Sequence, residues 1–152
     1  MGKDVIAEMA STCMFIRTRL IARTITGIYD KKLRPFKIGS TPFAVLVVIY
    51  QIEPATRAEI GRILHLDPST LTRSLKEMLC AGWAEETKEG ADGRSRPIVL
   101  TSAGRDLLHK AVPAWQSAQD QVKVLLGKDG VIATMDVANR IMKPTAIGIV
   151  GI

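Results

Sequence analysis

Apolar residues recur every three or four positions in two short segments near the middle of the chain. The first begins at Thr56 and should end near Leu64; its apolar stripe consists of Ala58, Ile60, Ile63 and Leu64. The second runs from Pro68 to about Ala81; its apolar face consists of Leu71, Leu75, Met78 and Leu79. Because a helix as short as the first is not stable alone, the pattern predicts two helices that pack against a neighbour.

Residues at the ends of these segments are those that begin and end helices. Thr56-Arg57-Ala58-Glu59 has the Ser/Thr-x-x-Glu form of a capping box. After a tight turn at residues 65–67, Asp67 is a good N-cap, with Pro68 at the first helical position. Gly82 follows the second helix, where glycine favours helix termination. The two segments therefore predict a helix-turn-helix.

The second helix has a polar face made of small hydroxyl residues followed by cations: Ser69, Thr70, Thr72, Arg73 and Lys76. Small donors can approach the base edges of duplex DNA, while longer cations reach bases or phosphates. The face therefore suits a recognition helix. Every amphipathic helix has a polar face, however, so this face alone fits a solvated surface equally well.

A hairpin follows, and it favours the DNA interpretation. Residues 83–87 and 97–100 form two short strand patterns around a glycine-containing loop at 88–95. We call this hairpin the wing; its candidate DNA-binding residues are Lys88, Asp92, Arg94, Ser95 and Arg96. Arginines are favoured in a narrow minor groove, and Asp92 would hold an arginine through a charge-assisted pair. The alternative is a solvated charged turn.

These features resemble the MarR family of bacterial winged-helix transcription regulators. The resemblance is carried by the element order, by Leu71-Thr72-Arg73, and by Asp92-Gly93-Arg94-Ser95-Arg96 leading into Val99-Leu100-Thr101-Ser102-Ala103-Gly104. Upstream, Tyr29-Asp30-Lys31-Lys32-Leu33-Arg34-Pro35-Phe36 and Thr41-Pro42-Phe43 are also similar, so the match covers roughly residues 12–126. Pro42 stands where the family commonly has Gln, and a first helical turn accepts proline.

The resemblance implies a mainly α fold with a small β-wing. We expect one domain over residues 1–152: a winged helix-turn-helix lobe at about 42–103, dimerisation helices at about 4–38 and 102–142, and a tail at 143–152. Residues 43–50 are rich in β-branched side chains, yet length and the resemblance favour a helix there.

The flanking segments also show helical spacing. One helix is expected from about Asp4 to Lys32, with Cys13 among its apolar positions. A long helix should run from Ser102 to Leu126, bent by Pro113 and ended by Gly127. Asp129 would then cap a last helix through Met142. The last two helices carry more apolar residues than one small domain covers, which predicts a homodimer.

Charge supports DNA binding only weakly. The net charge is +6 and the pI about 9.6, but residues 51–100 hold 7 basic and 8 acidic side chains. Where the cations lie therefore matters more than their number. No signal peptide pattern or membrane-spanning run is visible, which predicts a cytoplasmic protein with no membrane partner.

The sequence thus predicts a sequence-specific DNA-binding transcription regulator, with double-stranded DNA as its partner. The resemblance implies a ligand-responsive repressor that binds a near-palindromic operator as a homodimer and responds to a small aromatic or anionic effector. We expect no enzyme activity, cofactor or metal, because the chain has no phosphate-cradling loop and its two histidines stand apart.

Two alternatives remain open. In a related branch of the family, a cysteine in the first helix senses hydroperoxides, and Cys13 is the candidate here, although it lies two residues upstream of that position. A buried structural thiol is the more common outcome, and Cys80 is expected to pack on the inner side of its helix. The other alternative is a winged-helix module that mediates protein contacts.

Overall fold

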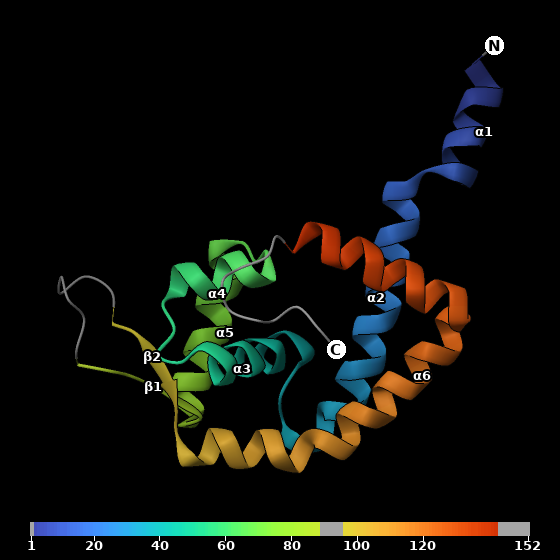
Figure 1. Ribbon diagram of the computed structural model, residues 1–152. Helices are drawn as coiled ribbons and strands as arrows, with labels where there is room; N and C mark the ends of the chain where they lie inside the picture. The colour runs from blue at the N-terminus through green and yellow to red at the C-terminus, as the bar shows by residue number, and fades with distance from the viewer. Residues whose placement is uncertain (1, 89–95, 143–152) are drawn as a thin grey trace.

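The computed structural model describes residues 2–88 and 96–142 (Figure 1). This part of the chain is mainly helical, with one two-stranded antiparallel sheet, so the expected fold class is confirmed. The elements in chain order are α1 Gly2–Thr12, α2 Met14–Leu33, the 3-10 helix η1 Arg34–Phe36, α3 Ser40–Ile52, α4 Arg57–Leu64, α5 Pro68–Ala81, β1 Ala84–Glu86, β2 Ile98–Leu100 and α6 Ser102–Ile141.

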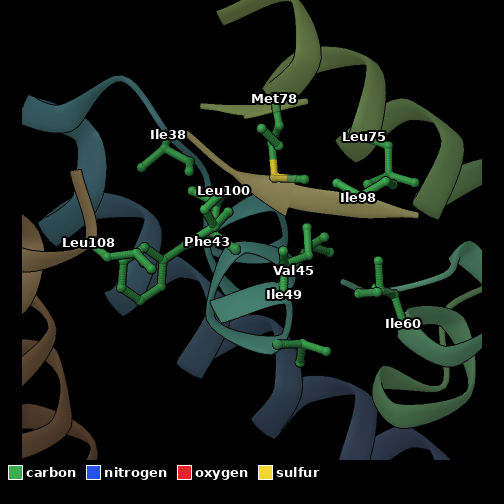
Figure 2. Packing of buried hydrophobic residues seen from close by; sticks show 14 of the residues in the cluster. Ile38, Phe43, Val45, Ile49, Ile60, Leu75, Met78, Ile98, Leu100 and Leu108 are labelled. Atoms are coloured by element: carbon green, nitrogen blue, oxygen red, sulfur yellow. The ribbon is translucent and has the colours of Figure 1, made fainter. Parts of the chain in front are cut away.

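Helix α3 lies at the centre of the hydrophobic core. Val45, Leu46 and Ile49 are fully buried, so the β-branched segment is a helix, as expected. Figure 2 shows side chains of α3 packed among residues from other elements: Ile60 of α4, Leu75 and Met78 of α5, Ile98 and Leu100 of β2, and Leu108 of α6. In Figure 1 the sheet lies on one side of α3, and α2 with most of α6 lies on the other. The core therefore connects the helix-turn-helix and the wing to the terminal helices.

The N-terminal helix is interrupted, contrary to the single helix expected from Asp4 to Lys32. Cys13 is extended (φ −61°, ψ 113°) and separates α1 from α2. The hydroxyls of Ser11 and Thr12 both donate to the carbonyl of Glu8, and such side-chain bonds to the preceding turn bend helices. The described side chains of α1 are exposed, and α1 projects away from the rest of the molecule (Figure 1). No packing therefore opposes the break.

The C-terminal helix follows the expected outline with one correction. Thr101 caps α6, and Gly127 interrupts it with non-helical angles (φ 69°, ψ 169°), after which the chain turns back (Figure 1). The helix resumes directly after Gly127, so Asp129 lies inside its first turn and does not precede it as a cap.

Across residues 2–88 and 96–142, no single helix is long and apolar enough to span a membrane. The segments Asp4–Phe36 and Ser40–Ile52 are long and apolar enough only when taken together, as a pair bent by 78°.

Candidate nucleic-acid interface

The first helix of the helix-turn-helix begins with the capping box expected from the sequence. The backbone N–H of Thr56 donates to Glu59 Oε2 over 2.8 Å, and the backbone N–H of Glu59 donates to Thr56 Oγ1 over 3.2 Å. The hydrogen bonds from the backbone and side chain of Thr56 lower the pKa of Glu59. Ile60 is fully buried against the core, whereas Ala58, expected in the apolar stripe, is exposed. This correction follows from the position of Ala58 two residues before Ile60, about 200° around the helix.

The second helix, α5, begins with a network centred on Asp67. Its carboxylate accepts the backbone N–H of Thr70 (3.0 Å) and the hydroxyls of Ser69 (2.6 Å) and Thr70 (2.5 Å). These bonds, led by the one from Ser69, hold the pKa of Asp67 far below its usual range. Both hydroxyl protons, expected to meet DNA, are therefore used within the cap. The oxygen atoms of the two residues keep lone pairs that can accept a hydrogen bond.

The outward face of α5 carries the other residues expected to recognise DNA. Thr72, Arg73 and Lys76 are exposed, and none of them forms a side-chain hydrogen bond or ion pair with residues 2–88 or 96–142. Leu71, Leu75 and Met78 are buried on the opposite face. The helix therefore presents a hydroxyl and two cations to solvent while its apolar face holds it on the core.

The structure contradicts the expected packing of Cys80. Its side chain is exposed, because Cys80 follows Met78 by two residues and so lies about 200° from it around the helix. Cys13 is partly buried at the break between α1 and α2. The two thiols are thus in different environments from those that helical spacing alone suggested.

Backbone pairing attaches the wing to the helix-turn-helix. Strands β1 and β2 pair with Ala84 opposite Leu100 and Glu86 opposite Ile98. On the other edge of β2, Ile98 exchanges two backbone hydrogen bonds with Ala55, of 2.8 and 2.9 Å. Ala55 directly precedes Thr56, the N-cap of α4. The backbone hydrogen bonds between Ala55 and Ile98 therefore hold strand β2 next to the start of α4.

The wing is also fixed between the end of α5 and the start of α6. Gly82 ends α5 in a left-handed conformation (φ 75°), and its carbonyl accepts the Thr101 hydroxyl over 2.6 Å. The Trp83 carbonyl accepts the Thr101 backbone N–H over 3.1 Å. A Cβ on Gly104 would lie only 2.0 Å from that carbonyl oxygen. Only glycine therefore permits this approach of α6 to the base of the wing.

The described ends of the wing carry two of its predicted DNA-binding cations. Lys88 and Arg96 are exposed. Asp92, Arg94 and Ser95, with the rest of the loop at 89–95, lie outside the described residues. In Figure 1 strands β1 and β2 lie at one edge of the helical body, with α5 beside β1. The recognition helix thus contacts the strand that leads to the wing cation Lys88.

A cleft lies between α3 and α6, and the sequence reasoning named none of its lining residues as a site. Its volume is about 270 Å³, and its lining is almost entirely apolar: Phe43, Val47, Tyr50, Leu108, His109, Val112 and Trp115. The rings of Tyr50 and His109 meet edge to face, with centroids 6.3 Å apart. The lining residues of α3 and of α6 each follow an i, i+4, i+7 spacing, and this spacing was the sequence signal that could have located the cleft.

Within the described ranges, no three His, Cys, Asp or Glu side chains gather as a metal site would require.

The helix-turn-helix followed by a two-stranded wing defines a winged helix-turn-helix protein. A sequence model of the MarR family matches residues 38–95. The chain is 34% identical over 80 residues to the uncharacterised HTH-type transcriptional regulator YwoH of Bacillus subtilis. It is 36% identical over 77 residues to the multiple antibiotic resistance protein MarR of Salmonella typhimurium. The matches cover 53% and 51% of this chain, and the chain spans only 58% and 54% of these relatives.

A solved structure extends the similarity over most of the chain. The transcriptional regulator MosR of Mycobacterium tuberculosis, in complex with DNA, is 35% identical; the match covers 85% of this chain and 93% of that one, with a TM-score of 0.73. The chain belongs to the MarR family.

Proposed function

We propose that the protein is a sequence-specific DNA-binding transcription regulator, not an enzyme, and that it acts in the cytoplasm. The observation that carries the proposal is the outward face of α5, where Thr72, Arg73 and Lys76 are exposed on a helix fixed to the base of the wing. The similarity to MosR, whose structure contains DNA, supports it.

In this proposal α5 occupies the major groove and the wing the neighbouring minor groove. Arg73 reads base edges, because an arginine matches the two acceptors of guanine in the major groove. Lys76 and the wing residue Lys88 contact phosphates, which position the protein without reading sequence. Arg96 lies two residues before β2, at the loop end of the described wing, and the proposed wing contacts include Asp92, Arg94 and Ser95, outside the described residues.

We further propose a homodimer formed by the terminal helices. Large apolar side chains of α6 are exposed in the single chain; they include Leu125, Ile132, Met135 and Ile141. A second copy would bury them, since soluble proteins rarely expose such a large apolar patch. Two-fold symmetry would place two recognition helices about 34 Å apart, which suits a near-palindromic operator.

The cleft between α3 and α6 is the site we propose for a small effector that releases a repressor from DNA. No described lining residue carries a formal charge, and aromatic rings dominate the lining. This favours a small neutral aromatic compound over an anion, because a buried anion needs a paired charge. The compound would act only if it bound one arrangement of the two helices better than another.

A titration of duplex DNA at several salt concentrations tests DNA binding. Each phosphate contact contributes about −0.9 to the slope of log affinity against log salt. We expect duplex affinity to fall steeply with salt, and we expect tighter binding to the promoter region of the protein's own gene than to random duplex. Absence of salt-sensitive retention of any duplex would refute the proposal and favour a module for protein contacts.

A further inference from the structure

The carboxylate of Glu53 joins three elements at the base of the wing. Glu53 is the C-cap residue of α3, directly after Ile52, and its side chain is only 18% exposed. One oxygen, Oε2, accepts the backbone N–H of Leu100 in β2 over 2.9 Å. The other, Oε1, forms an ion pair with the guanidinium of Arg105 in the first turns of α6. A single side chain thus connects α3, the wing and α6.

The bond to Leu100 completes the outer edge of the wing. Ile98 turns its backbone N–H and carbonyl toward Ala55, and alternate residues of a strand direct these groups to the same edge. The N–H of Leu100 therefore faces the same side as that of Ile98, beyond the reach of Ala55. The Glu53 carboxylate occupies the place where a third strand would supply a carbonyl.

Arg105 is held from a second direction by an aromatic ring. Its guanidinium carbon lies 5.6 Å from the centroid of Tyr50, within the range of a cation–π interaction. Tyr50 belongs to α3, one turn before Glu53. The guanidinium is thus oriented by a carboxylate and a ring from the same helix, and lysine would reproduce only the charge.

We propose that Glu53 and Arg105 are positioning residues for DNA recognition by the wing. Neither contacts DNA; together they hold β2 against α3 and α6, so that the wing cation Arg96 meets the duplex while α5 occupies its groove. This inference rests on the proposed function and adds to it the residues that set the position of the wing. Loss of the pair should remove the wing's contribution to binding and leave that of α5.

A double-mutant cycle in the full chain tests the proposal through duplex affinity and salt slope. In the wild-type background, Arg96→Ala should weaken binding about five- to tenfold at 0.15 M salt and reduce the slope by about one. Arg105→Met alone should already reduce the salt slope. In that background Arg96→Ala should weaken duplex binding less than about twofold, because the effects of coupled sites are not additive. Arg105→Lys should restore part of the coupling.

Two further variants separate positioning from stability. Glu53→Gln keeps an acceptor for the backbone N–H of Leu100 and removes the ion pair with Arg105. The cost of Arg96→Ala in the Glu53→Gln background should therefore be as small as in the Arg105→Met background. This second background replaces Arg105→Met if Arg105→Met folds poorly. Tyr29→Phe removes a 2.5 Å hydrogen bond from α2 to Gln119 of α6 and should leave the salt slope unchanged. An equal cost of Arg96→Ala in wild-type, Arg105→Met and Glu53→Gln backgrounds would overturn the proposal while DNA binding stands. Wild-type protein without salt-sensitive binding would refute DNA binding itself and the role of the pair with it.

Discussion

Gly104 makes the closest contact between α6 and the base of the wing, and an alanine there would disturb that contact directly. The added Cβ would lie 2.0 Å from the Trp83 carbonyl oxygen and 2.9 Å from the carbonyl carbon. Because both atoms are backbone, no side chain can rotate away, and α6 must move relative to the wing. Overpacking of this kind costs about 1–3 kcal/mol, and alanine recovers about 0.5–1 kcal/mol through its higher helix propensity.

We therefore expect Gly104→Ala to lose about 1–2 kcal/mol of unfolding free energy. For a chain of this length that lowers the Tm by roughly 2–8 °C in a circular dichroism melt, and duplex affinity should fall with it. Gly27→Ala is the matched control: Gly27 lies in α2, and beyond the neighbouring backbone of that helix nothing lies within 4 Å of an added Cβ, so the Tm of this variant should rise. If Gly104→Ala melted at or above the wild-type temperature, the close approach of α6 would not be what fixes the wing.

Three other predictions address recognition, pH dependence and the thiol. Arg73→Ala should relax sequence preference more than it weakens nonspecific binding; equal losses on operator and random duplex in competition titrations would contradict base reading. Because hydrogen bonds lower the folded pKa of Asp67 and Glu59, their contribution to stability is complete above the unfolded values near 4 and is lost as pH falls through the folded ones. Thermal melts should therefore show a declining Tm below about pH 4, and a smaller decline in Asp67→Asn, which caps without ionising; identical declines would argue against the Asp67 network. Cys13→Ser should leave unchanged any release of DNA by peroxide, measured by fluorescence anisotropy, and loss of that release would show that Cys13 is the sensor.

Elements with strong local signals were predictable from the sequence. Helix α5 begins and ends as expected because Asp67, Pro68 and Gly82 act on adjacent backbone groups. The capping box of α4 is local in the same way. Helix α3 needed more than local propensity, since its β-branched residues are helical only because they lie at the centre of the core.

The features that were not predicted depend on contacts between distant parts of the chain. The Glu53–Arg105 pair joins residues 52 positions apart, and no spacing rule identifies it. The cleft arises where two apolar helical stripes meet, which requires the crossing of α3 and α6. The break at Cys13 was missed because the sequence keeps its helical periodicity there, whereas the described side chains of α1 pack against no core that would hold one continuous helix.

Hydrogen–deuterium exchange of the full chain, with and without duplex carrying its promoter region, tests most directly whether α5 and the wing bind DNA. We predict slower exchange in α5 and in strands β1 and β2 when the duplex is present, since buried and bonded amides open less often. The account would be contradicted if the duplex bound but exchange in α5, β1 and β2 stayed unchanged, with slower exchange confined to α1 or α2.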